Sequence, residues 1–360
     1  MILGILTLAV QIKWNPPYQV VEKPANVSSY VQKLKGKTQG IFVDRDVMTM
    51  ISRGKANSLL ILDWYKAPFT YIADQDAWVS QTRMKDWNQA FFQYTVKDGS
   101  GKTTPDFFRG AKAPKMPTFQ NPLKGTVTEY TLKSEALAED RKIFVYLPPD
   151  APKNIPFIVM ADGAACTALA QVVEPEILAK RIRPVAIVGV PNGGYRGGDG
   201  PFDMAKDFRA KEYLKMFDPE RFSAHLKFVC DEVIPWAREK FELSTKFEET
   251  AVFGFSNGGA FAFAAAIDRP DVFGLSFACS IAATDIEGTR AKSLKDVKTK
   301  FYVQAGTLEV FIKNTTALHE ILTAKGIESH LRVFVSGHEF VACQIGLVDN
   351  LKTLFPVKRN

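Results

Sequence analysis

Residues 250–266 of this 360-residue chain read TAVFGFSNGGAFAFAAA, and this stretch decides the fold. Residues 250–253 are a short apolar run that favours a β-strand. Residues 254–258 spell G-x-S-x-G, and the small side chains among residues 259–266 favour a helix. The sequence therefore predicts a strand, a sharp turn that contains Ser256, and a helix.

Ser256 is the residue on which this pattern depends. A strand, a sharp turn and a helix are the context in which G-x-S-x-G presents a nucleophilic serine. The turn forces strained backbone angles on the serine, and flanking side chains would keep the helix from packing back onto the strand. Gly254 and Gly258 remove that obstacle. The alternative interpretation is a glycine-rich turn in which Ser256 only caps the helix.

The composition is that of an ordinary globular protein. Hydrophobic residues make up 46% of the chain and charged residues 24%, which are common values for globular domains. The formal net charge is +7, but the lysines are scattered and no nucleic-acid-binding motif accompanies them. We therefore expect no nucleic-acid partner. The length accommodates one large α/β domain and a smaller module.

The cysteine spacing argues against a metal site. The four cysteines are Cys166, Cys230, Cys279 and Cys343. None forms a C-x-x-C pair, and most lie in apolar runs. We expect buried thiols rather than disulfides, and neither a metal nor a cofactor.

The first residues leave the cellular compartment open. Residues 2–10 are apolar, but they lack a basic n-region and an A-x-A cleavage site, and they are too short to span a bilayer. They are either a clipped signal peptide, which implies a periplasmic or secreted protein, or a strand of a cytoplasmic one. No other stretch is long and apolar enough to cross a membrane.

Residues 1–118 are predicted to form a small all-β module. Short β-like runs such as residues 59–62 and 91–96 alternate with turn signals such as Lys97-Asp98-Gly99. The segment is rich in aromatic residues, namely Trp64, Tyr65, Phe69, Tyr71, Trp78, Trp87, Phe91, Phe92 and Tyr94.

Residues 111–117 are rich in lysine and proline and form the predicted linker. The second domain is then predicted to span residues 119–360. A chain that starts near Asn121 is expected to fold and to keep the chemistry of that domain.

From about residue 125 onward, predicted strands and helices alternate. The predicted strands are residues 142–147, 157–160, 185–190, 251–253, 275–278, 301–303 and 331–335. Several are apolar on both faces, as buried parallel strands are. Apolar residues that step by four and three from Phe222 to Trp236 predict a helix that is kinked at Pro235. The alternation indicates an α/β fold with a doubly wound, mostly parallel sheet, in which ligands collect beyond the carboxyl ends of the strands.

A nucleophilic serine needs a base, and the chain offers four histidines. His225 and His319 lie within predicted helices and His330 opens a strand, so we interpret these three as structural. His338 follows the last predicted strand, beside Gly337 in a turn at the strand's carboxyl end. We therefore predict His338 as the general base, with a surface loop histidine as the alternative.

The carboxylate that orients the base is predicted from its place after a strand. Glu309 lies just past the predicted strand of residues 301–303. The order Ser256, Glu309, His338 is the order of α/β-hydrolases. Asp285, which follows the strand after the turn, is the alternative acid.

An oxyanion intermediate needs backbone N–H donors. We predict one from Asn257, which follows the nucleophile. The second is predicted from Gly163 or Ala164, in the loop after the strand of residues 157–160. The competing interpretation of this loop is an ordinary strand-to-helix turn.

Two glycine-rich segments do not carry phosphate chemistry. Residues 99–104 resemble the end of a P-loop, but Val96 stands where its first glycine belongs and Pro105 follows where a helix belongs. We predict a hairpin turn there. Residues 192–200 never spell G-x-G-x-x-G and are predicted to be a long loop that frames the site.

Together these motifs resemble the putative-esterase family, which includes enterochelin (ferric enterobactin) esterases and is akin to esterase D and feruloyl esterases. The resemblance covers residues 122–355, and it is carried by Arg141-Lys142-Ile143-Phe144-Val145-Tyr146-Leu147-Pro148-Pro149, Asp162-Gly163, Arg209-Ala210-Lys211-Glu212-Tyr213, Asp231-Glu232-Val233-Ile234-Pro235-Trp236 and Gly254-Phe255-Ser256-Asn257-Gly258-Gly259. It implies an α/β-hydrolase domain, an immunoglobulin-like N-terminal module, and Ser256 and His338 as catalytic residues. Arg209 and Glu212 are the implied substrate-binding residues.

The predicted function is that of a serine carboxylic-ester hydrolase acting on a small-molecule ester, either a siderophore or an aryl or glycan ester. Ala164-Ala165-Cys166 stands where relatives often carry a polar or aromatic residue, so the pocket is expected to differ from theirs. An acyltransferase with the same triad is one alternative, and a non-catalytic binding protein on a degenerate hydrolase scaffold is another. The sequence leaves the ester and the oligomeric state open.

Overall fold

The computed structural model describes residues 15–53, 56–61, 65–67, 69–98, 103–282 and 285–357. The apolar segment of residues 2–10, Trp64 and the turn at residues 99–102 lie outside the described residues.

The chain divides into two compact units, which are described separately. Unit 1 contains Met1–Lys115 together with Gly306–Val310 and Val333–Glu339. Unit 2 contains Met116–Ala305, Phe311–Arg332 and Phe340–Asn360. Two short segments from the C-terminal half of the sequence therefore belong to the same unit as the N-terminal residues.

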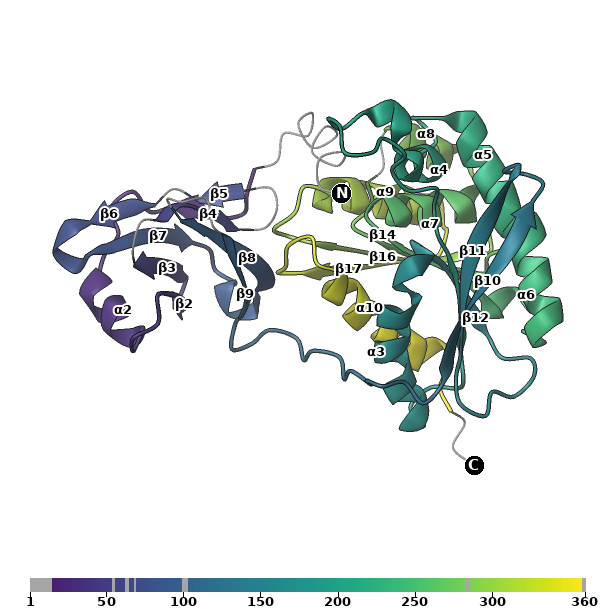
Figure 1. Cartoon of the computed structure of the whole chain (residues 1–360), viewed down its shortest axis with the longest axis horizontal. Coiled ribbons are helices and arrows are strands. Elements are labelled where there is room, and N and C mark those ends of the chain that lie inside the picture. Colours follow the sequence, from purple (N-terminus) through teal and green to yellow (C-terminus); the bar gives the residue numbers. More distant parts are fainter. Residues whose placement is uncertain are drawn as a thin grey trace. The chain divides into compact units, whose positions relative to one another are not determined.

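A single sheet of eight strands organises unit 2 (Figure 1). Its order is β10-β11-β13-β12-β14-β15-β16-β17. The strands are β10 (Thr126–Ser134), β11 (Glu139–Leu147), β12 (Phe157–Ala161), β13 (Ala186–Val190), β14 (Thr250–Phe255), β15 (Leu275–Cys279), β16 (Lys300–Gly306) and β17 (Ser329–Phe334). The first three pair in antiparallel fashion, and the pairs from β13 to β16 are parallel. The prediction of a mostly parallel sheet is confirmed.

The apolar character of the central strands explains their place in this sheet. Every residue of β12, β13 and β15 is buried, as expected for strands covered on both faces. All seven predicted strands are present. Strand β10 is absent from the prediction because it lies at the edge of the sheet, where most of its side chains are exposed and no apolar run marks it.

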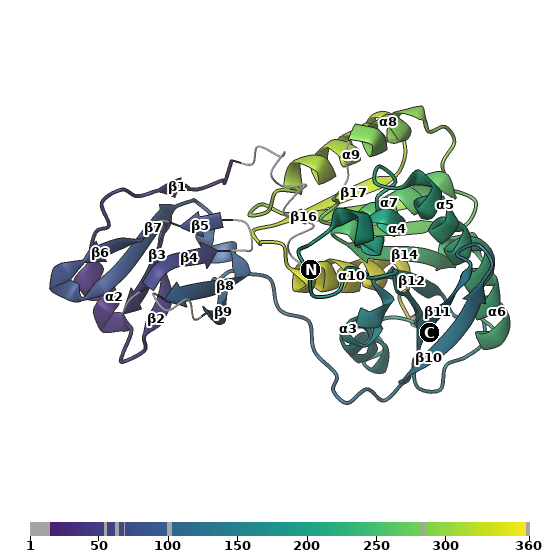
Figure 2. The ribbon, with the colours of Figure 1, turned by 45° about the horizontal axis from the view of Figure 1, so that its top comes forward.

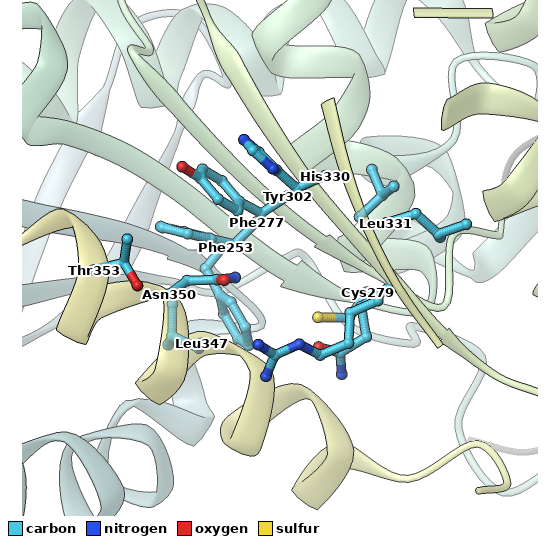
Figure 3. A pocket seen from close by; sticks show the side chains of 12 residues that line it. Phe253, Phe277, Cys279, Tyr302, His330, Leu331, Leu347, Asn350 and Thr353 are labelled. Carbon is cyan, nitrogen blue, oxygen red and sulfur yellow. The ribbon is translucent and has the colours of Figure 1, made fainter. Parts of the chain in front are cut away.

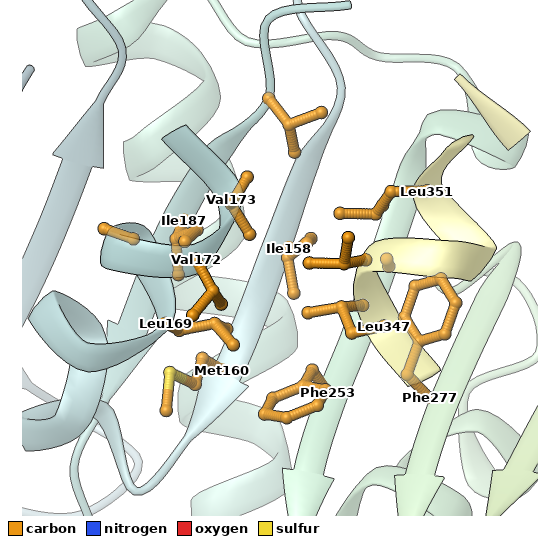
Figure 4. Packing of buried hydrophobic residues seen from close by; sticks show 14 of the residues in the cluster. Ile158, Met160, Leu169, Val172, Val173, Ile187, Phe253, Phe277, Leu347 and Leu351 are labelled. Atoms are coloured by element: carbon orange, nitrogen blue, oxygen red, sulfur yellow. The ribbon is translucent and has the colours of Figure 1, made fainter. Parts of the chain in front are cut away.

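Helices cover both faces of the sheet (Figure 2). They are α3 (Cys166–Leu178), α4 (Phe208–Tyr213), α5 (Pro219–Lys227), α6 (Ile234–Phe241), α7 (Asn257–Asp268), α8 (Asp285–Ser293), α9 (Ile312–Ala324) and α10 (Phe340–Leu354). Helices α3 and α10 cover one face, where Leu169 and Val173 of α3 and Leu347 of α10 pack against Ile158 and Phe253 of the sheet (Figure 4). On the other face, the Ser276 hydroxyl of β15 donates a hydrogen bond to a carbonyl of α7.

The segment from Phe222 to Trp236 is more irregular than one kinked helix. Helix α5 continues into a π-helix, Phe228–Val233, before α6 begins. Pro235 has no N–H to donate and its ring crowds the carbonyl of the preceding turn. The wider π turn directly before it accommodates both effects, so the expected kink takes the form of a change in helix type.

Unit 1 contains two antiparallel sheets. One has the order β1-β7-β3-β2, with β6 also paired to β7, and the other has the order β5-β4-β8-β9. The strands are β1 (Gln19–Val20), β2 (Gln39–Asp44), β3 (Val47–Arg53), β4 (Ala56–Ile61), β5 (Tyr65–Ala67), β6 (Thr70–Ile72), β7 (Ala77–Arg83), β8 (Phe91–Asp98) and β9 (Thr103–Arg109). Among the described residues of unit 1, the short helix α2 (Val27–Lys33) accompanies them. A β-rich module is observed, while its assignment to the immunoglobulin class stays a prediction.

The core of unit 1 draws on both parts of its sequence. Trp87 and Phe92 are fully buried and pack with Met48. Leu308, from the segment Gly306–Val310, is buried in the same cluster. The aromatic residues of the N-terminal segment therefore supply core packing, and residues near position 308 depend on them.

Glu174 of α3 is the buried acceptor that connects the start of unit 2 to its sheet. It accepts hydrogen bonds from the Lys124 N–H (2.7 Å), the Gly125 N–H (2.6 Å) and the Tyr146 hydroxyl (3.1 Å). We predict that Glu174→Ala lowers the free energy of unfolding by about 2–4 kcal/mol, because three donors lose their acceptor. Glu320→Ala, at an exposed position of α9, is the control and should change it by less than about 0.5 kcal/mol. Urea unfolding measures both, and equal values for the two variants would contradict the prediction.

Candidate active site

The backbone of Ser256 is strained as the G-x-S-x-G pattern requires. Ser256 stands between β14 and α7 with φ 62° and ψ −122°, a region that non-glycine residues avoid at a cost of about 1–3 kcal/mol. Its N–H donates to the carbonyl of Cys279 (3.0 Å) and its carbonyl accepts from Ala260 (3.0 Å). These bonds hold the serine at the end of β14.

Glycines permit the close packing around this turn. A Cβ on Gly254 would overlap the carbonyl of Gly258, and a Cβ on Gly259 would overlap the carbonyl of Cys279. Helix α7 therefore approaches β14 and β15 more closely than any side chain at these two positions allows.

Ser256 is 2% exposed, and its hydroxyl has no hydrogen-bond partner among the described residues. A buried hydroxyl without a partner costs roughly 1–3 kcal/mol. A serine that merely capped α7 would use its oxygen to accept a hydrogen bond from the first helical turn, and Ser256 makes no such bond. The capping interpretation is therefore not supported.

The loop after β12 lies beside this turn. Asp162 adopts a left-handed conformation with φ 55°, and Gly163–Ala165 form one 3-10 turn, η3. A Cβ on Gly258 would lie 2.9 Å from Oδ2 of Asp162. Gly163 is buried and Ala164 is exposed. Unit 2 thus brings the two predicted oxyanion segments, Asn257 at the start of α7 and Gly163 with Ala164, to one edge of the sheet.

Arg209 holds this loop in place. Its Nε and Nη2 both donate to the carboxylate of Asp162, each at 2.8 Å. Asn192 Nδ2 donates to the same carboxylate (2.7 Å), and the Asp162 N–H donates to the hydroxyl of Tyr213 (2.6 Å). The sequence analysis predicts that Arg209 binds substrate. In the structure, two of its donor groups form hydrogen bonds with Asp162.

Glu212, which is also predicted to bind substrate, lies in the interior of unit 2. Its side chain is fully buried. It accepts hydrogen bonds from Arg141, from Arg221 Nε (2.9 Å) and from the Gly193 N–H (2.7 Å). Although burial by itself raises the pKa of a carboxyl group, the guanidinium groups of Arg141 and Arg221 hold the pKa of Glu212 below its ordinary value. In the structure Glu212 anchors the loop that begins at Gly193, and its role in substrate binding stays a prediction.

His225 is fully buried next to Glu212. Its ring centroid is 5.1 Å from that of Phe261 and 5.5 Å from that of Tyr213, and its Nδ1 is 3.5 Å from Glu212. Burial lowers the pKa of His225 to about 4, against the opposing effect of the Glu212 charge. His225 is therefore a neutral, packed ring at neutral pH.

The other two histidines interpreted as structural make local contacts. His319 lies within α9, and its Nδ1 is 2.9 Å from the hydroxyl of Ser329. His330 lies in β17, stacks on Tyr302 with ring centroids 4.8 Å apart, and pairs with Glu328 (3.0 Å).

Glu309 and His338 lie together in unit 1. The Glu309 side chain is fully buried, and its Oε2 lies 2.6 Å from Nδ1 of His338. Its other oxygen accepts a hydrogen bond from the Gly306 N–H (2.7 Å). A carboxylate bonded to Nδ1 keeps the ring proton on that nitrogen and leaves Nε2 as an acceptor. The predicted acid and base therefore form an oriented pair. Ser256 belongs to unit 2.

The alternative acid, Asp285, is the first residue of α8. Its side chain lies outside the described part of the structure.

The four cysteines are buried free thiols, as predicted. Burial raises the pKa of both Cys166 and Cys230 to about 12, so these thiols stay protonated. Within the described residues, no three His, Cys, Asp or Glu side chains are grouped to hold a metal ion. None of the described helices is long and apolar enough to span a bilayer.

A cavity of about 260 Å³ lies on the α10 side of the sheet (Figure 3). Phe277, Tyr302 and Leu347 contribute to its lining, which includes none of the predicted site residues. A second hollow, of about 10 Å³, is lined by Tyr213, Ala260 and neighbouring residues near the first turn of α7. It has room for about one water molecule.

Asp162 is the site residue whose role sequence reasoning missed. It appears in the sequence as an Asp-Gly pair directly after a buried strand, but its contacts with Arg209 and Asn192 join positions that are far apart in the chain. A polar residue at the carboxyl end of a central strand was the available signal.

Comparison with known proteins places residues 134–354 in the family described as "Putative esterase". A relative from Bacillus subtilis (strain 168), the uncharacterized protein YjcH, is 29% identical over 203 residues, which are 54% of this chain and 78% of that protein.

Solved structures share the fold at low identity. Ferric enterobactin esterase from Salmonella typhimurium matches with a TM-score of 0.69 and 15% identity, over 90% of this chain and 98% of its own. The enterobactin esterase of Shigella flexneri matches with a TM-score of 0.67 and 16% identity, over 90% and 97%. A ferulic acid esterase from Anaeromyces mucronatus matches with a TM-score of 0.53 and 19% identity, over 67% and 95%. These matches show an esterase fold.

The buried His225 should make folding stability depend on pH. The folded protein protonates this ring near pH 4, whereas the unfolded chain does so near pH 6.5. The folding stability that comes from keeping His225 neutral is fully present above pH 6.5 and is lost as the pH falls toward 4. Between pH 7 and pH 5 it amounts to about 2 kcal/mol. We predict that His225→Phe, which keeps an aromatic ring, loses less stability than the wild type over this range in urea unfolding. Parallel losses in the two proteins would contradict it.

Proposed function

We propose, since this chain belongs to the putative-esterase family, that it is a serine carboxylic-ester hydrolase that works through an acyl-enzyme on Ser256. Family membership and the esterase fold support ester hydrolysis. The strained backbone of Ser256, with φ 62° and ψ −122° at the junction of β14 and α7, carries the assignment of the nucleophile.

His338 and Glu309 are the proposed base and acid. The hydrogen bond between Glu309 and Nδ1 of His338 orients the imidazole for proton transfer at Nε2. Ser256, Glu309 and His338 follow β14, β16 and β17, which belong to one sheet. The Phe301 N–H donates to the carbonyl of Glu328, and the Thr307 N–H donates to the carbonyl of Phe334. The residue numbers of the two partners increase together, so β16 and β17 are parallel. Each of the three residues thus follows the carboxyl end of a strand, which supports the proposal that they act together.

The proposed reaction has two halves. The Ser256 oxygen attacks the ester carbonyl carbon while its proton passes to Nε2 of His338. The tetrahedral oxyanion receives hydrogen bonds from the N–H of Asn257 and from that of Gly163 or Ala164. The C–O bond then breaks, and the alcohol leaves with the proton from His338. Water, deprotonated by His338, releases the acid and restores Ser256.

For the substrate we propose a small-molecule ester, either a siderophore or an aryl or glycan ester. The similar structures include esterases of enterobactin and of ferulic acid. A panel that contains a catecholate siderophore, a feruloyl ester and a simple aryl ester distinguishes these possibilities.

We also propose that the β-rich N-terminal module is immunoglobulin-like.

Ser256→Ala should lower kcat by at least about a thousandfold, because the acyl-enzyme can no longer form. Ser276→Ala is the matched control. It also removes a buried serine hydroxyl, from the neighbouring strand β15, and should keep most of the activity. Hydrolysis of an aryl ester and labelling with a fluorophosphonate probe measure both variants. A Ser256→Ala protein that keeps a tenth of the wild-type rate would exclude this nucleophile.

Glu309→Gln should lower kcat more than Asp285→Asn does. A neutral amide at position 309 favours the wrong tautomer of His338. In related triads such a change lowers kcat by up to about ten-thousandfold. The rates of the two variants on one ester make the comparison. A larger loss in Asp285→Asn would transfer the role of the acid to α8.

A further inference from the structure

The edge of strand β8 in unit 1 is occupied by the segment that carries His338. Strand β9 pairs along one edge of β8 from Phe91 onward, and the described residues of β4 pair with the opposite edge from Tyr94 to Asp98. The Phe91 N–H donates to the carbonyl of Val335 (3.0 Å), and Phe91 forms a parallel bridge with Ser336. The start of β8 is thus paired with residues just before His338.

Glu339, next to His338, completes this contact. Its Oε1 accepts a hydrogen bond from the Gln93 N–H at 2.6 Å. Successive N–H groups of a strand point to opposite edges, so Phe91 and Gln93 present theirs on the same side. A carboxylate therefore takes the place of a strand carbonyl at Gln93. Glu339 is 7% exposed, which makes its hydrogen bond costly to lose.

The segment that carries Glu309 is held in the same unit. Leu308 is buried among the aromatic residues that surround Trp87 and Phe92. The Leu308 N–H donates to the carbonyl of Ser336 (3.0 Å). The acid segment, the base segment and the β8 edge are therefore joined by backbone bonds and by a shared core.

From this arrangement we infer that the β8 edge positions the acid–base pair and that Glu339, through its bond to the Gln93 N–H, is a positioning residue for His338. The inference rests on the proposed function, in which His338 is the base. It assigns the N-terminal module a part in catalysis. It also contradicts the expectation that a chain starting near Asn121 keeps the chemistry, because such a chain lacks the β8 edge and the core around Leu308.

The test uses three variants of the full-length protein. Glu339→Ala removes the acceptor. Glu339→Gln keeps an amide oxygen that accepts from Gln93 but removes the charge. Gln81→Ala is the matched control, since Gln81 is a buried residue of β7 that likewise accepts a hydrogen bond from a backbone N–H, that of Ala25 (2.9 Å).

For each variant, kcat, KM and the pH dependence of kcat are measured on one aryl ester at a temperature where thermal unfolding shows the protein to be folded. Glu339→Ala is expected to lower kcat about ten- to a hundredfold, the effect of misplacing a catalytic group by about 1 Å, with little change in KM. Glu339→Gln should restore most of kcat with an unchanged pH profile, and Gln81→Ala should keep the wild-type kcat.

Three results would overturn the inference: wild-type kcat in Glu339→Ala, an equal loss in Gln81→Ala, or a Glu339→Gln variant as slow as Glu339→Ala with a shifted pH profile. The last result would mean that Glu339 acts through its charge. His338→Ala separates this inference from the proposed function. If that variant stays active, the proposed base is wrong, whereas an inactive His338→Ala beside a fully active Glu339→Ala overturns only the positioning role.

Discussion

The packing of α7 onto the sheet is the constraint on which the site in unit 2 depends. Gly254 and Gly259 let backbone meet backbone at Gly258 and Cys279, so the chain passes from β14 into α7 without an intervening loop. Ser256 must then take a conformation that costs about 1–3 kcal/mol. The burial of β14 and of nearly the whole of α7 offsets this strain. Helix α7 begins directly after Ser256, and its first N–H groups have no intrahelical acceptor.

Two clusters of charged residues in unit 2 hold loops. Asp162, which leads into the predicted oxyanion loop, is held by Arg209 and Asn192. Glu212 is held by Arg141 and in turn accepts from a backbone N–H at the start of the glycine-rich loop. Removing one partner from a buried pair leaves an uncompensated charge, so these contacts favour one conformation of each loop.

In unit 1, segments that lie far apart in the sequence belong to one compact unit. Glu309 and His338 lie in the C-terminal half of the chain, yet their segments belong to a unit made mostly of residues up to Lys115. Short segments that follow strands have little core of their own, and these two obtain one from the aromatic cluster around Trp87. The aromatic richness of the N-terminal module thus has a packing explanation that requires no ligand.

The sequence by itself determined the sheet, the turn and the order of the catalytic candidates. Apolar runs locate the buried strands because burial on both faces favours apolar residues. Glycine at positions 254 and 258 locates the turn, where a Cβ on Gly254 would overlap backbone and a Cβ on Gly258 would lie 2.9 Å from the Asp162 carboxylate. Edge strand β10 and the π-helix at Phe228–Val233 were not foreseen, since neither follows from a local pattern. Only the tertiary structure decided that Glu212 is buried, that Arg209 holds Asp162, and that Glu339 completes the β8 edge. These contacts join residues 47 to 246 positions apart, and hydrogen bonds over such separations leave no periodic trace in the sequence.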